Sequence, residues 1–260
     1  MKKILILTTL MIALISTACQ SIPVTTSTAA PSAAPIDEHV KPEILTADPT
    51  QIKSSTLLIV VESVQPSGVK LVYSMGTLVQ YQGELFVVTH NHYKDYLQDM
   101  NLIELRDAEN GMILPIYASE FKKLIIYQDA GTMVLLAPDG VANALTPASL
   151  DVAPQLKPGD TVQVAYHRQS NRDKVEVLEA VIEEVDVSAA EPVVTLRSLN
   201  GELIRPGDSG GGVWYNGKLV ANTWSVLTTH SALDASGNVD PASQTLTGLS
   251  NAAIFPEGFK

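Results

Sequence analysis

The sequence predicts an all-β protein with two β subdomains, and three observations lead to this prediction. Short runs rich in Val, Ile, Leu, Thr and Tyr recur along the chain, and no long stretch spaces its apolar residues at helical period. A segment containing several Pro, Ala and Gly residues, 138–158, separates two sets of these runs. Many short strands without intervening helices favour barrels or a sandwich over an α/β sheet.

The expected strands are bounded by Gly, Asn, Asp or Pro. The first set comprises Leu57–Val64, Val69–Gln80, Leu85–Thr89, Leu102–Arg106, Met112–Tyr117, Leu124–Tyr127 and Met133–Ala137. The second set comprises Thr161–His167, Val175–Val187, Val193–Leu199, Val213–Tyr215, Leu219–Leu227 and Gly248–Phe255. Within the second set, Asn216-Gly217 lies between two apolar runs and predicts a tight hairpin.

The N-terminus predicts an export signal over residues 1–18. Lys2 and Lys3 precede an apolar run, Ile4–Ile15, that is short for a membrane span. Small residues then lead to Cys19, an arrangement that resembles the lipobox of bacterial lipoproteins, in which the cysteine is acylated. Ser16 departs from that pattern, where Leu is usual. We therefore expect a lipid-anchored protein of the cell envelope, with free secretion as the alternative.

Residues 19–50 are dominated by Ser, Thr, Ala and Pro and predict a flexible tether. The folded domain is expected over 51–260, with its first half at about 51–140 and its second at about 155–260. It contains no cysteine, so no disulfide stabilises it. A net charge of −11 and the lack of a basic cluster argue against a nucleic-acid partner, and the membrane is expected only through the anchor.

The glycine-rich loop, residues 206–212, carries the strongest chemical signal. It places Ser209 after Gly207-Asp208 and before three glycines. Acyl transfer needs an exposed hydroxyl beside backbone N–H groups that converge on an oxyanion, and a preceding Gly can turn its N–H toward that point. The alternative is a glycine-rich turn with an incidental Ser. Gly207-Asp208-Ser209-Gly210-Gly211 resembles the nucleophile loop of the chymotrypsin/trypsin-like serine peptidases.

This resemblance implies two packed antiparallel β-barrels with the active site in the cleft between them, and a triad in the order His, Asp, Ser. Phe86–His92 resembles the family's apolar strand followed by Thr-x-x-His, which assigns the general base to His92. His90 is a departure, since the family usually has a small residue or Asn there. The alternative interpretation is two exposed turn histidines. A metal site is not expected, because no third ligand is evident nearby.

Asp129–Leu136 resembles the family's Asp-x-small-apolar-Leu segment, with Thr132 at a usually apolar position. The resemblance gives Asp129 the role of holding the histidine through a hydrogen bond. The other histidines, His39, His167 and His230, lack the preceding strand motif and are expected at the surface.

The implied mechanism is that of a serine endopeptidase acting on a polypeptide substrate without a cofactor. His92 takes the proton of Ser209 as the hydroxyl attacks, and an acyl-enzyme forms and is hydrolysed. The N–H groups of Gly207 and Ser209 hold the oxyanion, where losing one donor typically costs about 3–4 kcal/mol of barrier.

Thr223-Trp224-Ser225 resembles the strand that pairs with substrate backbone and lines the specificity pocket. A core tryptophan is the alternative for Trp224. Leu203 falls where members that prefer Arg or Lys have Asp, which argues against strong basic specificity. These four residues are the expected substrate contacts.

The family's zymogens are activated when a freed Ile-Val N-terminus pairs with the Asp next to the nucleophile. Here Ile59-Val60 lacks both the following glycines and a cleavage signal. We therefore expect a site that forms without propeptide removal, with Arg205 as a candidate partner for Asp208.

Two other functions remain open. One is a surface binding module on the same scaffold without turnover, because a fold does not guarantee activity. The other is an esterase that uses the same acyl chemistry on a non-peptide substrate.

Overall fold

The computed structural model describes residues 46–66, 68–95, 100–168, 171–188, 192–199, 201–230 and 244–255. The predicted signal peptide, Cys19 and His39 lie outside these ranges. Over the described ranges, none of the helices has the length and apolar character needed to cross a bilayer.

Strands dominate the described chain, with a few short helical segments between them. In chain order the elements are α1 (Pro49–Ser55), β1 (Thr56–Gln65), β2 (Gly68–Tyr81), β3 (Glu84–Thr89), η1 (Asn91–Asp95), β4 (Met100–Arg106), β5 (Met112–Tyr117), α2 (Ala118–Leu124), β6 (Ile125–Gln128), β7 (Met133–Leu136), α3 (Asp139–Ala144), β8 (Ala148–Ser149), β9 (Thr161–Arg168), β10 (Asn171–Asp186), β11 (Val193–Ser198), β12 (Gly212–Tyr215), β13 (Lys218–His230) and β14 (Gln244–Ile254). Each predicted run coincides with one of these strands.

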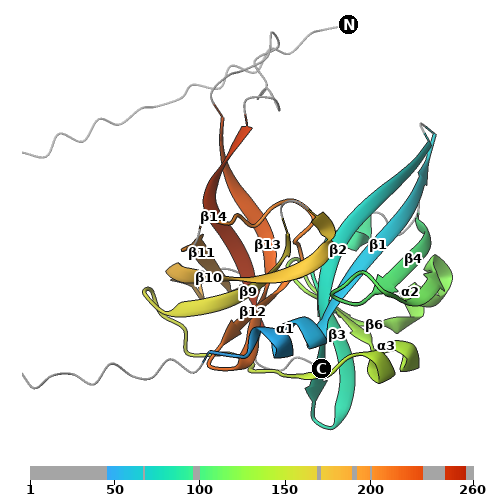
Figure 1. Cartoon of the computed structure of the whole chain (residues 1–260), viewed down its shortest axis with the longest axis horizontal. Helices are drawn as coiled ribbons and strands as arrows, with labels where there is room; N and C mark the ends of the chain where they lie inside the picture. The colour runs from blue at the N-terminus through green and yellow to red at the C-terminus, as the bar shows by residue number, and fades with distance from the viewer. Residues whose placement is uncertain are drawn as a thin grey trace, which may run out of the picture. The chain divides into compact units, whose positions relative to one another are not determined.

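The strands form two β-domains (Figure 1). The first β-domain is an eight-stranded sheet in the order β5-β4-β1-β2-β3-β7-β6, with β8 paired in parallel to β2. The second β-domain is a closed barrel in the order β10-β11-β14-β13-β12-β9. All the other strand pairs are antiparallel. The prediction of an all-β protein with two packed β subdomains is confirmed.

Three short helices, α1, α2 and α3, were not predicted from the sequence. They have 7, 7 and 6 residues, too few to show an apolar period. Local chemistry explains α1: Pro49 occupies the first turn, and the carboxylate of Asp48 accepts a hydrogen bond from the N–H of Thr50 at 2.9 Å. Helix α1 also begins within the segment predicted as tether.

The hairpin predicted at Asn216-Gly217 joins β12 to β13. Tyr215 pairs with Lys218, so the loop has two residues. Both loop residues have positive φ, 50° at Asn216 and 77° at Gly217. This is the conformation that Asn-Gly adopts in tight hairpins, and the prediction is confirmed.

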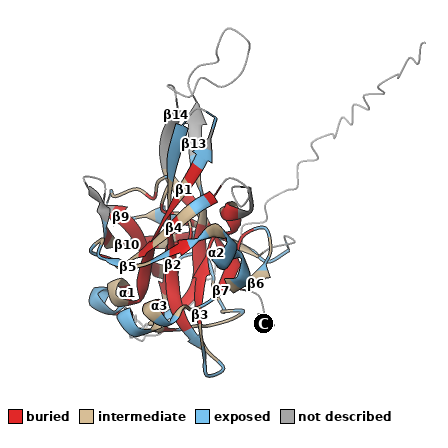
Figure 2. Ribbon diagram, turned by 90° about the vertical axis from the view of Figure 1, so that its right-hand side faces the viewer, coloured by how far each residue is buried: buried red, intermediate tan, exposed pale blue. Residues whose placement is uncertain are grey.

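The buried side chains form three clusters, and the buried strands are red in Figure 2. One cluster fills the first β-domain and another fills the barrel. The third cluster joins the two, since Met75 and Val88 of the first β-domain pack in it with Trp214 and Phe255 of the second. Burial of this apolar surface holds the two β-domains together.

The glycine-rich loop lies where the two β-domains meet. The N–H of Met75, on β2, donates to the carbonyl oxygen of Ser209 at 2.9 Å. The next residue, Gly210, has a φ of +85°, and a Cβ at that position would lie 2.1 Å from the carbonyl oxygen of Met75 and 2.9 Å from the N of His90. Only a residue without a side chain therefore fits against the first β-domain here.

We expect Gly210→Ala to destabilise the protein much more than Gly217→Ala, measured by urea unfolding. Gly217 has a similar φ, +77°, but its Cβ would meet nothing within 4 Å. The control therefore carries the backbone strain alone, about 1–2 kcal/mol. The overlap at Gly210 should add at least about 2 kcal/mol. Equal losses in the two variants would show that the close approach to Met75 contributes nothing.

Candidate active site

The peptide group that joins Ser209 to Gly210 is held from both β-domains. From the first, the hydroxyl of Ser74 donates to the carbonyl oxygen of Ser209 at 2.8 Å, beside the bond from Met75. From the second, the N–H of Gly210 donates to the carbonyl of Thr223 at 2.8 Å. Gly207 has a φ of +106°, so the loop uses the conformational freedom that the sequence analysis expected there.

The carboxylate of Asp208 faces away from solvent and is 2% exposed. Its Oδ1 accepts the N–H of His167 at 2.7 Å and lies 2.8 Å from His167 Nδ1. Its Oδ2 accepts the backbone N–H of Arg205 at 2.7 Å. Arg205 is thus a partner through its main chain. The expectation that His167 lies at the surface was wrong, because this side chain is 7% exposed and faces the loop.

The two histidines of the Phe86–His92 segment differ in environment. His90 is 5% exposed, and its Nδ1 lies 2.7 Å from the carbonyl oxygen of Gly131. Since a carbonyl only accepts, Nδ1 carries the proton in this contact. His92 lies half-buried on η1, with its ring centroid 5.2 Å from that of His90 and 4.5 Å from that of Tyr93. Neither is an exposed turn histidine.

Burial lowers the pKa of His90 below its ordinary value. The hydrogen bond to Gly131 and the charge of Asp129 oppose this shift but do not overcome it. His90 is therefore neutral at pH 7, with a protonated Nδ1 and a basic Nε2.

The loop that carries Asp129 is fixed by its own carboxylate. Oδ2 accepts the hydroxyl of Tyr127 at 2.7 Å, and Oδ1 accepts the N–H groups of Gly131 at 2.9 Å and Thr132 at 2.6 Å. None of these three donors is an imidazole. The link to the histidine segment uses the side chain of Asn91, which donates to the main-chain carbonyl of Asp129 and accepts from the side-chain amide of Gln128.

Asn222, on β13, connects this loop to the second β-domain. It is 1% exposed, and its side chain donates to the carbonyl of Gly131 at 3.1 Å and accepts from the hydroxyl of Thr132 at 2.9 Å. The carbonyl of Gly131 therefore meets both Asn222 and His90. Asn222 and Tyr127 could not be identified from the sequence as structural parts of the site, because no local motif marks them, and His90 stood out only as a departure within its motif.

A pocket of about 290 Å³ opens beside Ser209. Three of the four expected substrate residues line it, namely Thr223, Trp224 and Ser225, whereas Leu203 does not. Trp224 is half-buried at a bulge of β13, and its ring centroid lies 6.2 Å from that of His90. It is thus a wall of this pocket and not a core tryptophan.

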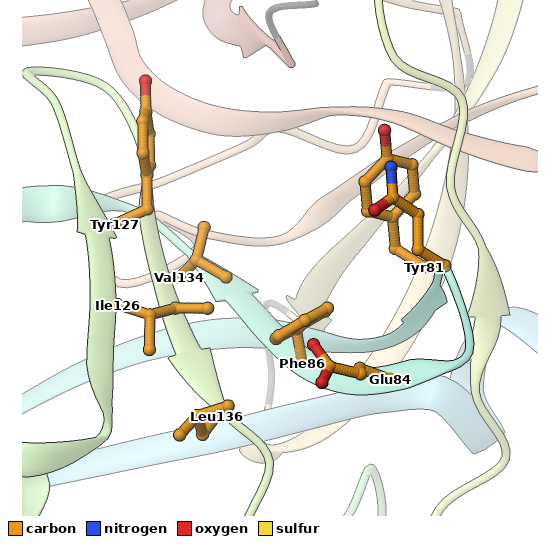
Figure 3. Close-up of a pocket in the computed structure, with 8 residues that line it drawn as sticks. Tyr81, Glu84, Phe86, Ile126, Tyr127, Val134 and Leu136 are labelled. Atoms are coloured by element: carbon orange, nitrogen blue, oxygen red, sulfur yellow. The ribbon is translucent and has the colours of Figure 1, made fainter. Parts of the chain in front are cut away.

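A second pocket, of about 370 Å³, lies on the first β-domain (Figure 3). Figure 3 shows apolar side chains of Phe86, Ile126, Val134 and Leu136 around it. Ser209 does not line this pocket and lines only the one beside the glycine-rich loop. Tyr127 connects this second pocket to the Asp129 loop, because it lines the pocket and its hydroxyl donates to the Asp129 carboxylate.

Among the described residues, no group of three or more His, Cys, Asp or Glu side chains could hold a metal ion. A hydroxyl lies on a loop with backbone N–H groups on both sides, a pocket adjoins it, and two histidines lie on the facing segment.

The fold is similar to that of solved HtrA-type proteases. One is AlgW with a decapeptide, with a TM-score of 0.52 and 12% identity over 78% of this chain and 60% of that chain. Another is AlgW with a tripeptide, with a TM-score of 0.51 and 13% identity over 79% and 57%. The chain thus spans less than two thirds of the length of these proteins, and identities this low establish the fold alone. No protein-family model matches the chain, and no curated protein matches its sequence.

We expect the protein to lose stability as the pH falls below about 6.5, and His90→Asn to reduce this loss. The folded state keeps His90 neutral, whereas the unfolded imidazole takes up a proton near its ordinary pKa of 6.5. Unfolding then gains protons on acidification, with a slope of at most about 1.4 kcal/mol per pH unit from this group. Asn cannot titrate but can still donate to Gly131.

The measurement is the free energy of urea unfolding of both proteins between pH 7.5 and 5.5. All other titrating groups are common to both proteins and cancel in the comparison. Parallel pH profiles would show that His90 is not held neutral in the folded state.

Proposed function

We propose that the protein is a serine endopeptidase with Ser209 as its nucleophile. One observation carries this proposal: the loop of Ser209 is fixed against the segment that bears His90 and His92. A Cβ on Gly210 would lie 2.5 Å from Thr89 Oγ1 and 2.9 Å from His90 N, so the backbone of the loop that carries Ser209 lies against the histidine segment of the other β-domain. The pocket beside Ser209 supplies room for a substrate side chain.

In the proposed mechanism His92 removes the proton of Ser209 as its oxygen attacks the peptide carbonyl. The N–H groups of Gly207 and Ser209 stabilise the oxyanion, the amine leaves, and water hydrolyses the acyl-enzyme. Asp129 acts on the base through its charge and its loop. The Asp129 carboxylate accepts from Tyr127, Gly131 and Thr132 in the structure. The proposal therefore requires a His92–Asp129 bond that forms when substrate binds, since catalytic hydrogen bonds often tighten only in that complex.

His90 is the competing general base. Its Nδ1 is held by a carbonyl oxygen, which leaves Nε2 free of its proton, as a general base requires. Two observations favour His92 over it: the Thr-x-x-His spacing, and the greater exposure of His92 as a whole residue. The variants described next separate the two residues.

We expect a fluorophosphonate probe to label the native protein and not Ser209→Ala. His92→Ala should lower the labelling rate by about 10²–10⁴-fold, the usual contribution of a general base. Ser54→Ala is the matched control, because this hydroxyl on α1 bonds only within its own helix, at 2.9 Å to the carbonyl of Gln51. It should label like the native chain.

Equal labelling of the native, Ser209 and His92 variants would contradict the proposal. Labelling lost in His90→Ala but kept in His92→Ala would assign the base to His90. A native protein that labels but cleaves small esters and no peptide would favour the esterase. A native protein that neither labels nor hydrolyses either substrate would favour the binding module.

We also propose that the protein is exported and anchored by a lipid on Cys19, outside the cytoplasmic membrane. The support is the apolar run that ends in small residues immediately before the only cysteine. Expressed in a bacterium, the native chain should incorporate radiolabelled palmitate, and Cys19→Ser should not. An unlabelled native protein found free in the medium would indicate ordinary secretion instead.

A further inference from the structure

The buried pair of His167 and Asp208 lies directly behind the proposed oxyanion site. Asp208 stands between Gly207 and Ser209, so the direction of its side chain fixes the direction of the peptide groups on both sides. Its own carbonyl oxygen accepts the N–H of Gly211 at 2.9 Å and the hydroxyl of Thr223. The loop is therefore held from its main chain and from its carboxylate at once.

A carboxylate this deeply buried must find donors, because an unpaired buried charge is strongly destabilising. Three donors meet it, and two of them come from His167: the N–H at 2.7 Å and Nδ1 at 2.8 Å, both to Oδ1. The third is the N–H of Arg205, at 2.7 Å to Oδ2. While His167 is in place, these donors hold the carboxylate of Asp208 in a single orientation.

His167 itself is rigidly placed. It lies on β9 of the closed barrel, paired with Val175 on β10, and its side chain is buried. A strand of a closed barrel is a firmer support than a loop. The donors of His167 are therefore in place without a bound substrate and without an N-terminus released by cleavage.

A freed Ile-Val terminus cannot provide this partner here. Ile59 and Val60 lie inside β1, paired with Ser74 and Tyr73 on one side and with Leu105 and Glu104 on the other. Releasing them would remove a central strand from the first β-domain. The carboxylate of Asp208 is already satisfied within the uncut chain.

We propose that His167 is a positioning residue that fixes the N–H groups of Gly207 and Ser209 for oxyanion binding, in place of a cleaved N-terminus. The inference rests on the proposed function, because the oxyanion belongs to that reaction. It assigns the site to the folded, uncleaved chain. His167 touches no reacting atom and acts through Asp208.

The test compares His167→Leu, which removes the side-chain donor, with His167→Asn, whose amide nitrogen can occupy the position of Nδ1. The matched control is Gln163→Leu on the same strand, which removes a buried hydrogen bond of 3.0 Å to the carbonyl of Ala47, remote from Asp208. For each protein we would measure kcat and KM on a peptide, the rate of fluorophosphonate labelling, and the urea midpoint.

We expect His167→Leu to lower kcat and the labelling rate by about 10²-fold or more with KM changed little, the pattern of a lost oxyanion donor. His167→Asn should stay within about tenfold of the native rates. Gln163→Leu should lose stability and keep its rates. The labelled native protein should have the intact mass expected for a chain uncut across Leu58.

Native rates in His167→Leu, or equal losses in His167→Leu and His167→Asn, would overturn the positioning role while leaving the peptidase in place. A labelled species that is always cut near Leu58 would also overturn it. If His167→Leu does not fold, His167→Asn and His167→Gln decide, because Gln places its amide beyond the Nδ1 position and should be the slower. A native chain that never labels would overturn the proposed function, and this inference with it.

Discussion

The hydrogen bond from the N–H of Met75 to the carbonyl oxygen of Ser209 joins the two β-domains at the centre of the candidate site. The hydroxyl of Ser74 meets the same oxygen, so strand β2 fixes the orientation of the Ser209 peptide. Gly210 then lies so close to Met75 that neither β-domain can shift without moving the loop. The geometry of the loop therefore depends on the apolar cluster around Trp214 that holds the two β-domains together.

The fold was largely predictable because its determinants are local in the sequence. Runs of β-branched and apolar residues gave the strands, and Asn216-Gly217 gave its hairpin, since both depend on neighbouring residues. The two-residue strand β8 and the three short helices could not be predicted. Each is too short to show a periodic pattern of apolar residues. The barrel closes because β10 pairs with both β11 and β9, the two ends of the series β11-β14-β13-β12-β9. No local signal in the sequence specifies these pairings.

The candidate site was predictable only where a motif is contiguous. The glycine-rich loop was recognised because Ser209 and its glycines are adjacent in the chain. The histidine partner of Asp208 was not, because His167 lies 41 positions away and reaches the loop only once β9 has joined the barrel. Asn222 was likewise missed, since it meets Thr132 across 90 positions. Contacts of this kind belong to the tertiary structure, whatever the chemistry of the residues involved.

Arg205 brings a positive charge to the pocket beside Ser209. Its backbone N–H donates to Asp208, and the residue also lines the pocket, whose other lining residues include no carboxylate. Among the described residues its guanidinium forms no ion pair. An inhibitor that presents an amidinium there meets a like charge with no counter-ion, whereas a carboxylate finds a two-pronged donor. Compounds designed against cation-selective peptidases are therefore poor starting points for ligands of this protein.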